Sequence, residues 1–138
     1  MTGTVLADTG PLYALADPSD QYHQQAIGEL DQIAGRKFRI AVHYPVLCES
    51  HTLVLRRLGG TYSRQWLGEL LESAVMLNPE PADYLSAAAL LDRFPDHPVT
   101  LIDAITAVLT RRLGIGVWSY DRHFTIMGIR HWRATGRR

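Results

Sequence analysis

Four acidic residues lie near the end of a predicted strand or the start of a predicted helix, and their carboxylates could together bind a metal ion. They are Asp8, Glu49, Asp103 and Asp121. Asp8 directly follows the apolar run Val5–Ala7. If the four carboxylates converge, they repel one another strongly, and a divalent cation relieves that repulsion. Carboxylate and water oxygens are the ligands that Mg²⁺ or Mn²⁺ prefers. Such an ion can acidify a water molecule and clamp a phosphate, so the chemistry indicated is hydrolysis of a phosphoester.

Each of these acids also has a purely structural interpretation. Asp8 could cap the helix that follows it, and Asp121 could cap a turn. Thr100 and Asp103 have the spacing of a capping box, in which the acid bonds back to the residue before the helix. A lone Glu such as Glu49 is usually solvated. The functional interpretation therefore depends on a fold that brings the four acids together.

The hydrophobic pattern predicts short apolar strands that alternate with amphipathic helices. The predicted strands are residues 5–7, 38–42, 75–77 and 115–119, with a weak fifth near 129–132. The predicted helices are residues 12–16, 20–34, 45–58, 62–73, 81–94 and 100–113, with a turn at 121–124. This alternation is typical of an α/β domain, here residues 1–138, whose parallel sheet is covered by helices on both faces. In such sheets, sites form outside the carboxyl ends of the strands, and Asp103 reaches that edge only if its helix begins there.

The composition limits the class of protein. With 138 residues, 46% of them hydrophobic and 20% charged, the chain has the size and balance of one globular domain. It has no apolar run long enough to span a membrane and no secretory signal at its amino end, so we expect a cytoplasmic protein. Its single cysteine, Cys48, excludes an internal disulfide, and we expect it to be buried. The histidines lack the spacing of a zinc site.

Four short motifs that contain the acids resemble, in the same order, the motifs of the PIN-domain family of metal-dependent ribonucleases. More narrowly, they are similar to the toxins of VapBC-type toxin–antitoxin pairs. The matching segments are residues 5–15, 43–49, 100–104 and 118–124. In the first segment, Asp8 resembles the family's first metal-binding Asp and Thr9 its neighbouring Thr. In the last segment, Ser119 stands where Thr is common.

The resemblance implies a three-layer α/β/α sandwich around a parallel sheet of about five strands. It implies a metal-dependent endoribonuclease, the toxin of a type II toxin–antitoxin system, that uses one or two Mg²⁺ or Mn²⁺ ions. On this analogy the residues that hold the metal are Asp8, Glu49, Asp103 and Asp121, and the residues that orient those carboxylates are Thr9 and Ser119. The resemblance also implies an RNA substrate, a homodimer, and a small antitoxin that inserts a segment into the acidic groove.

Other functions remain open at this level. A housekeeping RNA-processing nuclease and a non-catalytic binding module could both use the same fold. A phosphoacceptor domain is disfavoured, because Asp8 is preceded by Ala7 instead of a second acid and the only lysine is Lys37. A haloacid-type phosphatase is disfavoured because it would need an Asp at the position of Gly10.

The net charge is zero, but the charge is unevenly distributed. Residues 1–35 carry five acids and no Lys or Arg, whereas residues 122–138 carry five arginines and no acid. A neutral total is therefore compatible with a local basic surface. If the arginine-rich end is ordered, it could contact RNA phosphates, and those contacts should weaken with salt. The alternative is a frayed terminus.

Overall fold

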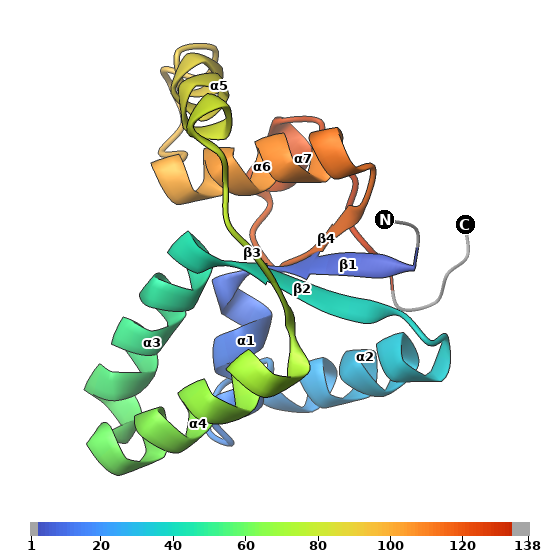
Figure 1. Cartoon of the computed structure of the whole chain (residues 1–138), viewed down its shortest axis with the longest axis vertical. Helices are drawn as coiled ribbons and strands as arrows, with labels where there is room; N and C mark the ends of the chain where they lie inside the picture. The colour runs from blue at the N-terminus through green and yellow to red at the C-terminus, as the bar shows by residue number, and fades with distance from the viewer. Residues whose placement is uncertain (1–2, 134–138) are drawn as a thin grey trace.

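The computed structural model describes residues 3–133 and contains a four-stranded parallel sheet (Figure 1). The strands are β1 (Thr4–Ala7), β2 (Arg39–His43), β3 (Val75–Leu77) and β4 (Gly116–Trp118). Their order across the sheet is β3-β2-β1-β4, and each neighbouring pair is parallel. All four residues of β1 are buried, as a short apolar run predicts for a central strand. Two arginines of the predicted basic end, Arg137 and Arg138, lie outside the described residues.

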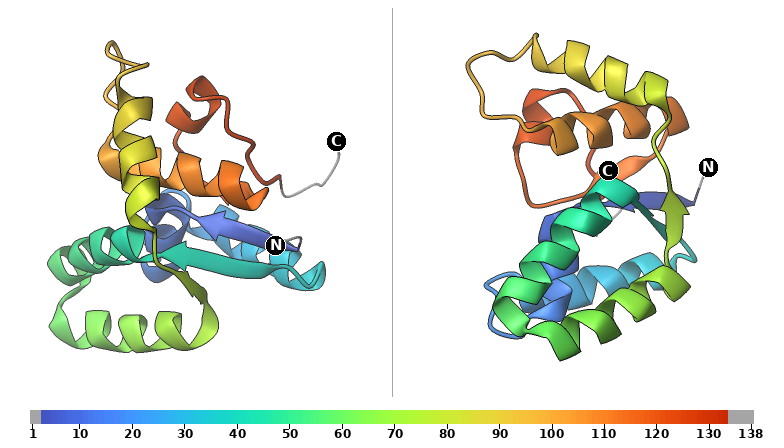
Figure 2. Two further views of the ribbon diagram at one scale, coloured as in Figure 1. Left: turned by 45° about the horizontal axis from the view of Figure 1, so that its top comes forward. Right: turned by 60° about the vertical axis from the view of Figure 1, so that its left-hand side comes forward.

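Seven helices complete this described part of the chain. They are α1 (Thr9–Ala16), α2 (His23–Gly35), α3 (Tyr44–Leu58), α4 (Gly60–Ser73), α5 (Pro81–Leu91), α6 (Leu101–Leu113) and α7 (His123–Ile126). Helices α1 to α4 lie on one side of the sheet and α5 to α7 on the other, and the turned views of Figure 2 show the same layers. The predicted three-layer α/β/α fold is therefore confirmed. Among residues 3–133, no helix is long and apolar enough to cross a membrane.

Alternate residues of the central strand supply two separate hydrophobic cores. Val5 and Ala7 belong to the core that packs against α1 to α4, and Trp118 of β4 joins them there. Leu6 belongs to the core that packs against α5 to α7, and Val117 of β4 joins it. Successive side chains of a strand point to opposite faces of the sheet, so one apolar run anchors both helical layers.

The weak fifth strand expected near residues 129–132 is a single bridge instead. The Val117 N–H donates to the Arg130 carbonyl over 3.0 Å, and the Trp132 N–H donates to the Val117 carbonyl over 2.8 Å. This close approach depends on Gly116, because a Cβ there would lie 3.1 Å from the Trp132 nitrogen. Pairing is limited to this one point of β4, so the sheet of the described residues has four strands.

Two smaller expectations also differ from the structure. The turn expected at 121–124 leads into the short helix α7, which begins at His123. Cys48 is exposed, not buried. The buried residues of α3 include Val46, Leu47 and Ser50, and the rotation of the helix places Cys48 away from that face.

The carboxyl ends of β1, β2 and β4 meet at one edge of the sheet. Helix α1 begins at Thr9, two residues after β1 ends, and α3 begins at Tyr44, directly after β2. Ala7 is the register partner of Trp118, so the residues that follow them, Asp8 and Ser119, also lie side by side. This edge is therefore where side chains from distant parts of the sequence converge.

Candidate metal centre

All four predicted acids line one cleft at this edge, with a volume of about 750 Å³. Asp8 lies between β1 and α1, Glu49 on α3, Asp103 in the first turn of α6, and Asp121 in the loop after β4. The other lining residues include Thr9, Arg56, Thr100, Tyr120 and His123. The helix that carries Asp103 does begin at this edge, as its contribution to the site requires. The structure thus brings the four acids together, while their role as metal ligands stays a prediction.

Asp8 is the most buried of these acids, with 7% of its surface exposed. Burial raises the pKa of its carboxyl to about 6, and the neighbouring Asp103 and Glu49 carboxylates act in the same direction. The hydrogen bond from Ser119 opposes this shift. Asp8 occupies the N-cap position of α1, as one interpretation predicts, but its side chain makes no capping hydrogen bond.

Ser119 connects the acids that follow the two neighbouring strands β1 and β4. Its hydroxyl donates to Asp8 Oδ2 over 2.8 Å and accepts the backbone N–H of Asp121 over 3.0 Å. One hydroxyl therefore fixes the Asp8 carboxylate and the backbone that carries Asp121. This geometry supports the orienting role that we predict for Ser119.

Thr9 makes the corresponding contact to α3. Its hydroxyl donates to Glu49 Oε1, and the Ser50 hydroxyl lies 3.4 Å from the same Thr9 oxygen. Ser50 also donates to the Val46 carbonyl over 2.7 Å, inside α3. Glu49 itself is exposed, so Thr9 is the group that gives this long side chain a defined position.

Asp103 is held by the capping box that the sequence predicts. The Thr100 N–H donates to Asp103 Oδ2, and the Asp103 N–H donates to the Thr100 hydroxyl, both over 3.1 Å. Burial raises the pKa of Asp103, and the Asp121 carboxylate adds to the effect. The structural and functional interpretations are therefore compatible, because the box sets the direction of a side chain that also lines the cleft.

Asp121 forms a compact cluster with Asp103 and with His123, which the sequence analysis did not select. One ligand atom from each of the three residues lies within 4.8 Å of the others. Asp121 Oδ1 accepts the His123 N–H over 2.9 Å, and His123 Nδ1 lies 3.0 Å from the same oxygen. The Asp-x-His spacing, which places an imidazole over its own turn, was the available signal for His123.

The electrostatics of the cleft fit a divalent cation. Within residues 3–133, the close contact between one of the four acids and a basic side chain is that of Asp121 with His123, which is an ion pair only when the imidazole is protonated. Arg56 lines the cleft but is exposed. Asp8 and Glu49 lie in the same cleft outside the close cluster. Burial is the main cause of the raised pKa of Asp8, and the negative charges of Asp103 and Glu49 add to it. An oxygen-rich donor set with excess negative charge is what Mg²⁺ or Mn²⁺ prefers.

A buried histidine connects the two helices that carry Glu49 and Asp103. His43 Nδ1 accepts the Val46 N–H over 3.2 Å, so it caps α3, and its Nε2 lies 2.7 Å from the Thr106 hydroxyl on α6. Since Nδ1 accepts a hydrogen bond, Nε2 carries the proton and donates to Thr106. Burial lowers the pKa of His43 to about 4. The neutral imidazole therefore fixes the distance between α3 and α6.

Solved structures with this fold include proteins of known toxin systems. VapC20 from Mycobacterium tuberculosis, described as a sarcin-ricin loop cleaving toxin, matches with a TM-score of 0.82 and 21% identity, over 94% of this chain and 98% of that one. VapBC2 from Rickettsia felis, solved with a DNA fragment from its promoter, matches with a TM-score of 0.75 and 11% identity, over 94% and 97%. PAE2754 from Pyrobaculum aerophilum matches with a TM-score of 0.60 and 20% identity, over 90% and 78%.

No family model and no curated protein matches the sequence itself. The structural matches nevertheless span nearly the whole chain, and they establish a PIN-like α/β fold. The chain therefore shares the architecture of VapC toxins and carries an acidic cluster at the carboxyl edge of its sheet.

Proposed function

We propose that this chain is an endoribonuclease that depends on Mg²⁺ or Mn²⁺ and serves as the toxin of a toxin–antitoxin pair. The observation that carries the proposal is the convergence of Asp8, Glu49, Asp103 and Asp121 in one cleft. The likeness to VapC20, a toxin that cleaves the sarcin-ricin loop, supports RNA as the substrate class. The hydrogen bonds of Thr9 and Ser119 support a site whose carboxylates are held in place before substrate binds.

The residues of the cleft would act by holding charge in fixed positions. Asp8, Glu49, Asp103 and Asp121 would bind the cation, and the Ser119 hydroxyl, which donates to Asp8 Oδ2, would hold the Asp8 carboxylate in position for it. When bound, a divalent ion supplies charge that offsets the phosphate and acidifies water for hydrolysis of the phosphodiester. Asp8 must be ionised to bind a cation, and its pKa of about 6 means that protons compete with the metal below that pH.

We propose a small antitoxin and a second copy of this chain as protein partners, in the cytoplasm. The acidic cleft suits a basic segment of an antitoxin. Exposed apolar side chains suit a protein interface: Leu85 on α5 is 75% exposed and Leu101 on α6 is 45% exposed. Light scattering of the purified chain should give twice the chain mass of 15.5 kDa. A mass of one chain at micromolar concentration would contradict the homodimer.

The activity is tested on a pool of structured RNAs with Mg²⁺, with Mn²⁺ and with chelator. Asp103→Asn is purified identically, because contaminating nucleases are the main hazard. Asp31→Asn, which changes an exposed acid on α2, is the matched control. We expect cuts at discrete sites that require metal, that Asp31→Asn retains, and that Asp103→Asn abolishes. Full cleavage by Asp103→Asn, or cleavage in excess chelator, would contradict the proposal.

A further inference from the structure

A second hollow, of about 320 Å³, adjoins the acidic cleft. Tyr120 and Asp121 line both, so the two hollows share a wall. The second hollow differs in chemistry from the first, because aromatic and basic side chains line it: Tyr22, Tyr120, Trp132, Arg122 and Arg133. We call these five residues with their hollow the aromatic groove.

The aromatic groove contains a prearranged stack of two rings. Tyr22 and Tyr120 lie 4.5 Å apart between ring centroids, at an interplanar angle of 24°. Tyr22 is still 37% exposed, so the stack leaves aromatic surface in contact with solvent. Exposed aromatic rings are the surfaces on which unpaired nucleobases stack, whatever their sequence.

Glu29 fixes the orientation of the Tyr120 ring in this stack through hydrogen bonds. Its Oε1 accepts the Tyr120 hydroxyl over 2.6 Å and the Trp118 indole N–H over 2.9 Å, and its Oε2 accepts the Gln25 amide over 3.2 Å. Both carboxylate oxygens of Glu29 are therefore engaged in hydrogen bonds. Because the Tyr120 ring is held in place by Glu29, a stacking ligand would not have to order it.

The aromatic groove carries arginines beside the acids Glu29 and Asp121, whereas four acids dominate the cleft. Arg122 and Arg133 line the groove and are exposed, and Asp121 lies at the boundary with the cleft. Arginine is well suited to phosphate contacts, since its planar guanidinium can bind two oxygens at once. A single RNA strand needs phosphate contacts and a surface for its bases, and both lie here next to the proposed site of hydrolysis.

We propose that the aromatic groove binds one nucleotide of the RNA strand adjacent to the cleaved phosphodiester. Its base would stack on the Tyr22–Tyr120 pair, and its phosphate would contact Arg122 and Arg133. This inference rests on the proposed ribonuclease function and adds the form of the substrate. The nucleotide must be unpaired, because a base inside a duplex cannot stack on a protein ring.

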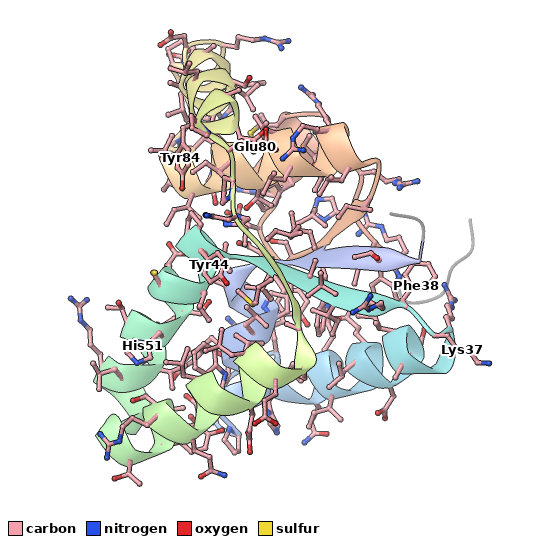
Figure 3. The ribbon with its side chains drawn as sticks, viewed as in Figure 1. Lys37, Phe38, Tyr44, His51, Glu80 and Tyr84 are labelled. Carbon is pink, nitrogen blue, oxygen red and sulfur yellow. The ribbon has the colours of Figure 1, made fainter. Side chains whose placement is uncertain are left out.

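Binding of a single-stranded probe tests the groove without relying on cleavage. The probe is a fluorescein-labelled decamer of oligoadenylate, and anisotropy is measured at low salt in the Asp103→Asn background. Tyr22→Ala should raise the Kd by at least about fivefold, whereas Tyr22→Phe, which keeps the ring, should stay within about twofold. Tyr84→Ala is the matched control, because Tyr84 is exposed to a similar degree on α5, across the sheet from α2 (Figure 3). Thermal unfolding of each variant verifies the fold.

The arginines are tested by the salt dependence of the same binding. Arg122→Gln and Arg133→Gln should each lower the slope of log K against log salt by about 1. Arg93→Gln, in the turn after α5 and outside the lining of both hollows, should leave the slope unchanged. An unchanged Kd for Tyr22→Ala, or no binding of the decamer, would overturn the proposal that the aromatic groove binds a nucleotide. Full cleavage by Asp103→Asn would overturn the proposed function, so the two failures are distinguishable.

Discussion

The two halves of the acidic cleft are held in different ways. Asp103 and Asp121 are fixed locally, by hydrogen bonds to backbone groups three and two positions away. Asp8 and Glu49 are fixed by hydroxyls from distant parts of the chain, Asp8 by Ser119 over 111 positions and Glu49 by Thr9 over 40. The hydrogen bonds that hold Asp103 and Asp121 can form as soon as their own helix and turn form. Those that hold Asp8 and Glu49 can form only when the sheet is assembled.

The difference in burial follows the same division. Asp8 lies at the centre of the sheet edge and is nearly inaccessible, so its ionisation is costly and its pKa is about 6. Asp121 lies in a loop, where its own turn and His123 surround it. Removing one acid from each half should therefore have the same effect on activity and opposite effects on stability.

The largest effect is expected from removal of the acids themselves. Asp8→Asn and Asp121→Asn should each lower kcat/KM for RNA by at least about 100-fold, because the charges that hold the cation act only together. In chelator, Asp8→Asn should unfold at a higher temperature than the parent, since it removes a buried carboxylate. Asp121→Asn should unfold at a lower temperature, since it loses the His123 contact. Equal melting shifts of the same sign would contradict the proposed difference between the halves.

Loss of an orienting hydroxyl should have the next largest effect. Ser119→Ala should reduce kcat/KM about 10- to 100-fold, because the partners of metal ligands typically contribute that much. Ser119→Thr should retain most of the activity, since it keeps the hydroxyl. The measurement is initial rates over a range of Mg²⁺ concentrations, in which the alanine variant should require more metal. Equal metal dependence for Ser119→Ala and the parent would show that Ser119 does not orient the site.

The dependence of stability on pH should separate Asp8 from His43. His43 has a folded pKa of about 4, below the 6.5 of an unperturbed imidazole, so the unfolded chain binds more protons between these values. Its contribution to the free energy of unfolding is therefore present above pH 6.5 and is lost as the pH falls towards 4. Asp8, raised from 3.8 to about 6, acts in the opposite direction over nearly the same window.

The two contributions should largely cancel in the parent and not in Asp8→Asn. Urea unfolding of Asp8→Asn in chelator should show stability that rises between pH 4 and 6.5 by an amount on the order of 1–3 kcal/mol. The same measurement on the parent should give a flatter profile. A profile for Asp8→Asn that equals that of the parent would contradict the raised pKa of Asp8. A profile for Asp8→Asn that does not rise over this range would contradict the buried, neutral state of His43.

The smallest effect is expected from the cap of α6. Thr100→Ala should lower the free energy of unfolding by about 1 kcal/mol, the usual loss for a removed helix cap. Because the Asp103 side chain still bonds to the backbone N–H at position 100, activity should fall less than for Ser119→Ala. Thr100→Ser, which keeps the capping hydroxyl, is the control for both measurements. A larger loss of activity in Thr100→Ala than in Ser119→Ala would contradict this prediction. It would show that activity depends more on the locally held acids than on those held by distant hydroxyls.

The sequence predicted the four acids of the site, because local patterns and the edge of the sheet are enough to locate them. A Thr three residues before an Asp predicted the cap at Asp103, and an apolar run that ends in Asp8 predicted a central strand with an acid at its edge. The layers followed from the alternation of strands and helices. The edge of the sheet then located Glu49 and Asp121 in the same cleft.

The parts that the sequence analysis missed depend on contacts over long separations. His43 and Thr106 are 63 positions apart, and nothing in either local pattern indicates that they meet. Tyr22 stacks on Tyr120 through the packing of α2 beside β4, so the aromatic groove was not visible either. The fifth strand was expected from a hydrophobic pattern near Ile129, but the segment pairs with β4 only at Val117.

The central claim is that the cleft holds a divalent cation through these acids, and titration with Mn²⁺ monitored by electron paramagnetic resonance tests it directly. The signal of free Mn²⁺ disappears on binding, so affinity can be measured without any RNA. The account predicts saturable binding by the parent and by Asp31→Asn, and binding at least about tenfold weaker in Asp8→Asn and Asp103→Asn. Equal affinity in all four proteins would show that the ion binds elsewhere and would contradict the account.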